Sequence, residues 1–195
     1  MDETLINDVA RAAHLLGLAL GFGSAILADL CAARSLIRPL DDHDFETLHR
    51  YHRTVAFGLM LFWASGLVLL WLRTGFDPAQ FSPKLMAKLG VVALLTVNAY
   101  LIGRIGLPTM QAWFGYRYGA LPLTHRLRLA ALAGMSGAGW ISALALGVFS
   151  AMKTFEWEVI SNIIGAIYVI GLGGALLTAC VAPLLNFAMN RATRV

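Results

Sequence analysis

Charged residues are scarce in this chain. Asp, Glu, Lys and Arg make up 13% of the 195 residues, whereas hydrophobic residues make up 58%. Soluble domains contain about 25% charged residues, so the composition argues against a soluble domain and for a membrane protein. Because most of the chain is needed to cross a bilayer, we expect one transmembrane helical domain covering residues 1–195.

Cysteine and the motifs of soluble enzymes are also scarce. The two cysteines, Cys31 and Cys180, lie in apolar surroundings, where they are expected to act as small hydrophobic residues rather than as a disulfide. The sequence contains no phosphate-binding loop, nucleophile elbow, serine–histidine–aspartate set or CxxC pair. A soluble-enzyme mechanism therefore has little support.

The chain contains several long hydrophobic runs. A membrane-spanning helix needs roughly 20 predominantly apolar residues, and five segments qualify. The first follows an acidic start and is too long for the apolar part of a signal peptide, so we expect it to be retained. The sequence predicts an all-α integral membrane bundle of five transmembrane helices over residues 9–36, 55–72, 85–107, 127–152 and 159–187.

The basic residues predict the orientation of the bundle. The net charge of +4 resides largely in arginines that flank the apolar runs, which favours a role in topology over nucleic-acid binding. Ten Lys and Arg residues fall on one side and five on the other, which places the N-terminus outside, the C-terminus in the cytoplasm, and the chain in the cell inner membrane as a multi-pass protein. The ten are Arg34, Arg38, Arg50, Arg53, Arg104, Arg117, Arg126, Arg128, Arg191 and Arg194.

Small residues recur at helical spacing in three of the predicted spans. Such residues let helix backbones approach closely, either within one bundle or between the copies of a homo-oligomer. The sequence leaves both arrangements open, with membrane lipid as the other partner. The three sets are Gly17, Gly21 and Gly23; Ala130, Gly134 and Ala138; and Gly171, Gly173 and Gly174.

Ionisable residues inside the spans are candidates for function, because burying them in a bilayer is costly. His14, near the outer end of the first span, is suited to bind haem iron or carry a proton; alternatively, it bonds a backbone carbonyl. Lys88 lies on the same side of the membrane and is predicted either to share a pocket with His14 or to extend to the interface, as we expect of Lys84 one turn earlier.

Asp29 lies nearer the cytoplasmic end of the first span, about 22 Å from His14 at 1.5 Å of rise per residue. It is therefore too distant to meet His14 directly. The arginines on the cytoplasmic side, such as Arg34, Arg53 or Arg126, are its natural partners. We expect a structural ion pair rather than a catalytic carboxylate.

The stretch LDDHDFETLHRYHR, residues 40–53, is unusually polar for this chain. Asp41 or Asp42 is placed to cap a helix that runs into the second span. On that helix His49 and His52 share one side, and with His125 they are metal-ligand candidates for a divalent ion on the cytoplasmic side. The alternative is a solvated helix start between two spans, since the spacing matches no fixed zinc motif.

Two further stretches resemble a known superfamily. AHLLGLALGFGSAILADLCAARSL begins with a histidine in the first span, and SPKLMAKLGVVALLTVNAYLIGR opens the third span with lysines. Together they are similar to the superfamily of HemJ-type protoporphyrinogen oxidases and CopD-type copper-resistance membrane proteins. The resemblance implies a haem b cofactor bound by His14, with Lys88 important for activity. The chain departs from the family in carrying Asn98-Ala99-Tyr100 late in the third span and in having a fifth span.

The sequence is therefore compatible with three functions. The first is a haem-b-binding membrane redox protein, such as a membrane oxidoreductase, or a haem-metabolism protein, in which His14 and Lys88 bind the cofactor and Lys88 is catalytic. A bis-histidine site at His52 and His125 is the competing arrangement. The second is a small proton or metal-ion transporter or channel lined by His14, Lys88 and Asp29. The third is a structural or assembly subunit of a membrane complex.

Overall fold

The fold was analysed in a computed structural model, which describes residues 2–192. Five of its helices are long and apolar enough to cross a membrane, and no strand occurs among the described residues. The prediction of an all-helical chain with five apolar spans is therefore confirmed. The long helices are α1 (Glu3–Ala33), α2 (Asp42–Thr74), α3 (Pro83–Leu101), α5 (Leu123–Val148) and α6 (Trp157–Ala192).

The remaining elements are short. A π-helical segment, η3 (Ile102–Gly106), joins α3 to α4 (Leu107–Ala112), so the third span continues beyond its predicted end at residue 107. Pro108 lies in the first turn of α4. Because proline lacks an amide hydrogen and its ring clashes with the carbonyl four residues earlier, it accounts for the widened turn. The 3-10 segments are η1 (Arg34–Leu36), η2 (Pro78–Gln80), η4 (Tyr118–Ala120) and η5 (Ser150–Lys153).

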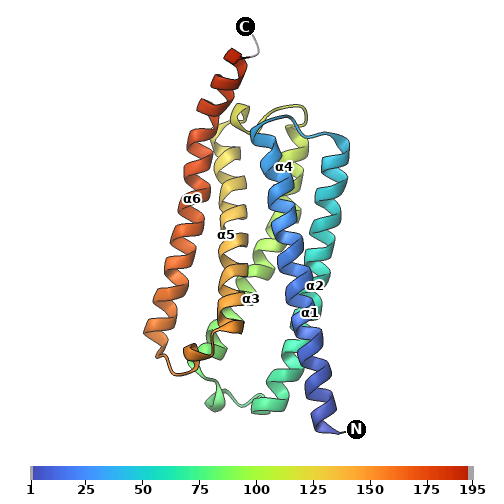
Figure 1. Ribbon diagram of the computed structural model, residues 1–195, viewed down its shortest axis with the longest axis vertical. Helices are drawn as coiled ribbons and strands as arrows, with labels where there is room; N and C mark the ends of the chain where they lie inside the picture. The colour runs from blue at the N-terminus through green and yellow to red at the C-terminus, as the bar shows by residue number, and fades with distance from the viewer. Residues whose placement is uncertain (1, 193–195) are drawn as a thin grey trace.

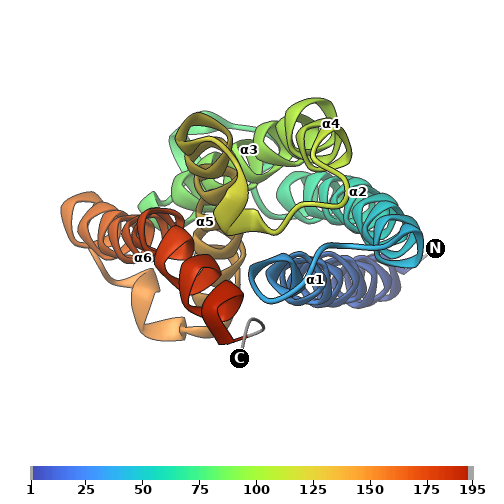
Figure 2. The same cartoon turned by 90° about the horizontal axis from the view of Figure 1, so that it is seen from above.

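The long helices run up and down in one bundle, with the described ends of the chain at opposite ends of it (Figure 1). We call the end that carries the α1–α2 connection the upper end, as it is drawn in Figure 1. Viewed from above, α5 lies between α6 and the α1–α2 pair (Figure 2). The fully buried Trp140 and Leu146 of α5 form a core with Leu59 of α2 and Leu95 of α3.

Glycines allow α1 and α2 to touch backbone to backbone. A Cβ atom on Gly17 would lie 2.8 Å from the amide nitrogen of Phe62, and one on Gly58 would lie 2.6 Å from the amide nitrogen of Gly21. The predicted close packing of Gly17 and Gly21 is confirmed. Gly23 does not take part, because nothing lies within 4 Å of the position of its Cβ.

Among the small residues of the other two predicted sets, some also meet a second helix and others do not. Gly134 of α5 packs against Leu172 and Gly171 of α6, where its Cβ would lie 2.9 Å from the Leu172 Cα. Gly173 and Gly174 meet no neighbour within 4 Å. A helical repeat of small residues thus marks a contact only where a second helix reaches it.

The α1–α2 connection is fixed by a buried carboxylate. Asp41 and Asp44 form a capping box at the start of α2, which confirms Asp41 as the helix cap. The Asp44 side chain is 1% exposed, and Arg38 reaches both of its oxygens, with Nη1 2.7 Å from Oδ2 and Nη2 3.1 Å from Oδ1. Arg34 Nη1 adds a contact of 3.2 Å. Paired charge-assisted bonds of this kind hold a connection in one geometry.

We predict that Gly17→Ala weakens the bundle by about 1–3 kcal/mol, because the added methyl group would push apart two backbones that cannot repack. Gly23→Ala, on the same helix, should leave stability unchanged or raise it slightly, because alanine favours the helix. The loss of helical circular dichroism on heating in detergent measures both. Equal midpoints for the two variants would contradict the close contact of α1 and α2.

Candidate functional site

A cavity of about 270 Å³ occupies the upper half of the bundle. It is bounded by α1, α2, the α3–η3–α4 span and α5, with minor contributions from η4 and α6. Its walls are mainly alanine and leucine side chains, and Trp140 lies at its lower limit as part of the packed core. Small-molecule sites are typically concave and mostly apolar with a few polar groups, and this cavity has that character.

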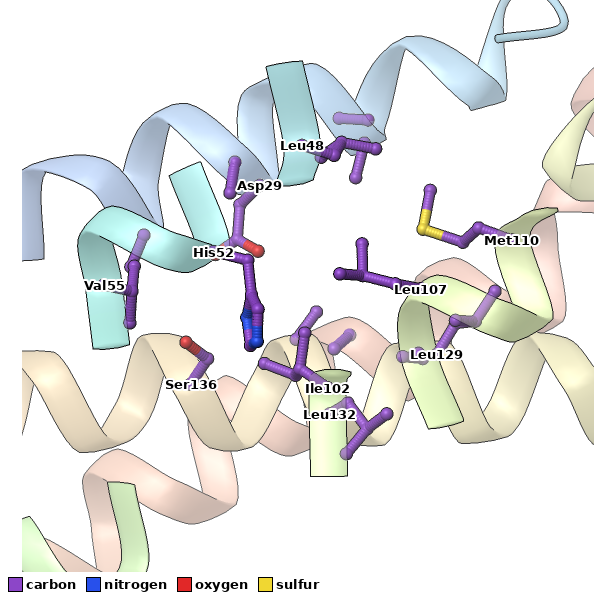
Figure 3. A pocket seen from close by; sticks show the side chains of 18 of the residues that line it. Asp29, Leu48, His52, Val55, Ile102, Leu107, Met110, Leu129, Leu132 and Ser136 are labelled. Carbon is purple, nitrogen blue, oxygen red and sulfur yellow. The ribbon is translucent and has the colours of Figure 1, made fainter. Parts of the chain in front are cut away.

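Asp29 of α1 and His52 of α2 both line the cavity. Figure 3 shows their side chains pointing into it from the two helices. Asp29 is exposed to the cavity, whereas His52 is half-buried. A carboxylate and an imidazole on facing helices can each bind or release a proton.

The ion pair expected for Asp29 does not form. Arg34 bonds Asp44 instead, and Arg126 Nη1 donates to the backbone carbonyl of Ala179 at 2.9 Å. Within the part of the chain that the structure describes, Asp29 has no ion pair with any basic side chain. The expectation of a structural ion pair was wrong because the α1–α2 connection carries its own carboxylate, Asp44, within closer reach of the arginines.

The π-helical segment η3 makes room for His52. A Cβ on Gly103 would lie 2.8 Å from Nε2 of His52, so the imidazole rests directly against the backbone of this glycine. Single π turns occur often at functional sites, because they change the direction of a helix locally. Gly103 was not among the predicted site residues. The signal in the sequence is a glycine shortly before Pro108.

Tyr118 of η4 forms part of the wall near the upper end. Its hydroxyl donates to the backbone carbonyl of Arg126 at 2.7 Å, and burial raises the pKa of Tyr118 to about 12. The phenol is therefore neutral at physiological pH. Together with the bond from Arg126 to α6, it fastens the α4–α5 connection over the cavity.

His14 lies outside this cavity, in the lower half of the bundle. Its Nδ1 is 3.2 Å from the Phe62 carbonyl oxygen and 3.1 Å from the Ser65 hydroxyl, and its ring stacks on that of Phe62 at 3.9 Å. This is the backbone hydrogen bond that the alternative interpretation of His14 expects. It also leaves Nε2 as the nitrogen available to a ligand.

The two lysines of α3 differ in their surroundings. Lys84 is 7% exposed and donates to the backbone carbonyl of Phe149, the residue that caps the end of α5, at 2.6 Å. Lys88 is half-buried and close enough for its charge to act on His14. The structure therefore brings His14 and Lys88 into one region, apart from the cavity that holds Asp29 and His52.

The three histidines predicted to bind a metal lie in different surroundings. His49 is exposed and its Nδ1 bonds the Phe45 carbonyl at 2.9 Å, whereas His125 packs against Trp113 and only His52 lines the cavity. Across residues 2–192, no three His, Cys, Asp or Glu side chains come together to hold a metal ion. The prediction of a divalent metal at His49, His52 and His125 gains no support from this geometry.

Comparison with known proteins adds nothing to this geometry, because no protein-family model, no curated protein and no solved structure matches the chain. The chemistry of the cavity and of the His14 region is therefore the guide to function.

We predict that Gly103→Ala displaces the His52 imidazole at a cost of about 1 kcal/mol, since the ring must rotate away from the added methyl group. In a chain that already carries His52→Ala, the same substitution should cost nothing. Gly90→Ala, in α3 of the same span, is the control, because nothing lies within 4 Å of its Cβ position. Thermal unfolding of the single and double variants measures the coupling, and a Gly103→Ala effect that is independent of His52 would contradict the contact.

Proposed function

We propose that the chain is a multi-pass membrane protein that translocates protons through the cavity, with Asp29 and His52 as the groups that carry them. The observation that supports the proposal is that these two titratable side chains enter one mainly apolar cavity, with no lysine or arginine in its lining. Ionisable residues at membrane depth commonly belong to proton or ion pathways.

The contrast between two aspartates of the upper half, the buried Asp44 and the exposed Asp29, supports this assignment. Asp44 is enclosed, capped by the backbone of α2 and bonded to two arginines, as expected of a carboxylate that stabilises the fold. Asp29 has no such partners and faces a cavity. A carboxylate that contributes no structural bond is retained at a cost in stability, which favours a chemical role.

In the proposed mechanism, a proton enters from the upper end and moves between the Asp29 carboxylate and the His52 imidazole. Trp140, 1% exposed, blocks passage to the lower half, because its ring packs directly against Gly21 of α1. Release toward the lower end therefore requires a movement of α5 relative to α1. The excess of arginines at the upper end favours a cytoplasmic location for that end.

We predict that Asp29→Asn lowers proton flux by about tenfold or more, because an amide cannot accept the proton that the carboxylate carries. Flux is measured in proteoliposomes with a trapped pH-sensitive dye, driven by a potassium diffusion potential with valinomycin. Asp8→Asn is the matched control, since Asp8 is an exposed carboxylate of the same helix and should leave flux unchanged. Equal flux for the two variants, or none above empty liposomes, would refute the proposal.

A haem b site at His14 is the second candidate, and the bonding of His14 favours it. Iron-binding histidines commonly bond a carbonyl through one ring nitrogen and the metal through the other, and His14 has its Nδ1 placed in this way. Lys88 would hold a haem propionate as a mobile positive charge. Haem bound there would supply one-electron chemistry. The superfamily resemblance points to the same two residues.

We predict that, if haem binds, His14→Ala abolishes the reduced-minus-oxidised haem spectrum of protein purified after expression with ample haem. His43→Ala, which changes an exposed histidine, should keep the full spectrum. A colourless unmodified protein would exclude the haem candidate and leave the proton pathway untouched. Haem that persists in His14→Ala would exclude His14 as its ligand.

A further inference from the structure

The ionisable groups of the cavity determine which charge a bound molecule can carry. Asp29 is the one acidic residue in the lining, and His52 is the one basic residue. Tyr118 is the remaining titratable group, and α3, η3, α4, α5 and α6 contribute none to the lining. When Asp29 is ionised and His52 neutral, the cavity therefore holds one uncompensated negative charge.

The rest of the lining limits the chemistry of a ligand further. An anion would meet the Asp29 carboxylate with no fixed positive side chain to bind it. A divalent metal ion needs several hard ligands, and no group of three His, Cys, Asp or Glu within residues 2–192 supplies them. A sugar or another highly polar molecule would lose its hydrogen bonds to water against walls of alanine and leucine.

One class of molecule fits both the charge and the walls. A monovalent organic cation places its charge at Asp29 and its apolar body against the alanines and leucines. The aromatic side chains of Trp140 and Tyr118 also line the cavity, and aromatic walls are favourable to quaternary and protonated amines. The volume of about 270 Å³ lies near the lower limit of small-molecule sites, which favours a compound with a single ring.

We infer that the cavity binds a small monovalent organic cation with an apolar body, such as an aromatic amine, through the Asp29 carboxylate. This inference rests on the proposed function, because the same carboxylate carries the proton. A proton and the cation then exclude one another: one proton leaves Asp29 when one cation binds, and the charge of the site is conserved. The cation is consequently a competitor of proton flux.

Benzyltrimethylammonium is the probe for this test, with neopentylbenzene as its uncharged isostere and benzenesulfonate as an anion with the same ring. Binding of the radiolabelled cation to the full chain in detergent is measured by equilibrium dialysis at about pH 5 and about pH 8, on either side of the range in which a carboxylate at membrane depth titrates. Proteoliposome proton flux is measured with and without the cation. Circular dichroism checks that Asp29→Asn and the control Asp8→Asn are folded.

We expect saturable binding of the cation, with an affinity that is higher at about pH 8 than at about pH 5. The affinity should fall by about tenfold or more in Asp29→Asn but not in Asp8→Asn, since only Asp29 faces the ligand. The cation should also inhibit proton flux. Equal binding of the uncharged isostere, or cation binding that Asp29→Asn leaves intact, would overturn the inference. Proton flux that depends on Asp29 but is insensitive to the cation would refute the inference alone, and absence of both flux and binding would refute the proposed function as well.

Discussion

The backbones of α1 and α2 touch at Gly17, Gly21 and Gly58, and the positions of both candidate sites follow from that contact. Helices that meet without intervening side chains hold a fixed distance and register. Asp29 and His52 extend from this pair into the cavity at its upper half. His14 and the Phe62 carbonyl meet within the pair at its lower half. A shift of either helix would therefore alter both sites together.

In the upper half of the bundle, the charged residues that stabilise the α1–α2 connection are distinct from the carboxylate that lines the cavity. Asp44, Arg34 and Arg38 close the α1–α2 connection and use the nearby positive charges for structure. Asp29 of α1, one to two turns below Arg34 of η1, forms no ion pair within residues 2–192. Because Arg34 and Arg38 are bound to Asp44, they do not neutralise Asp29, and this unpaired carboxylate is the basis of both the proposed proton pathway and the proposed organic-cation site.

Much of the fold could be predicted from the sequence, because apolar runs of sufficient length leave a chain few alternatives to spanning helices. A local signal was equally reliable, because Asp41, one of the two predicted caps, caps α2. Asp29, His14 and Lys88 were identified as candidates from their cost at membrane depth, and His52 from its spacing in the polar stretch of residues 40–53. Residues of these kinds are conspicuous in an apolar chain, so their identification needs no knowledge of the fold.

The grouping of those residues could not be predicted, because it depends on how helices distant in sequence face one another. Asp29 lies 23 positions from His52, and nothing in their spacing places them in one cavity. The cavity also depends on the widened turn before Pro108, where Gly103 admits the imidazole of His52. Arg34 was assigned to the wrong carboxylate because both aspartates lie within reach in the sequence, and only the turn geometry distinguishes them.

The proposed proton pathway requires the cavity that contains Asp29 to be open to water at the arginine-rich upper end. Ala133→Cys tests it, since Ala133 is an exposed residue of the cavity lining, in a chain whose Cys31 and Cys180 are replaced by alanine. Ala166→Cys on α6, which is exposed but outside the cavity, is the control. In sealed vesicles, a membrane-impermeant thiol reagent should modify position 133 from the upper side alone and leave position 166 unmodified. Failure to modify position 133 from that side, or equal modification of both positions, would contradict an aqueous cavity at Asp29.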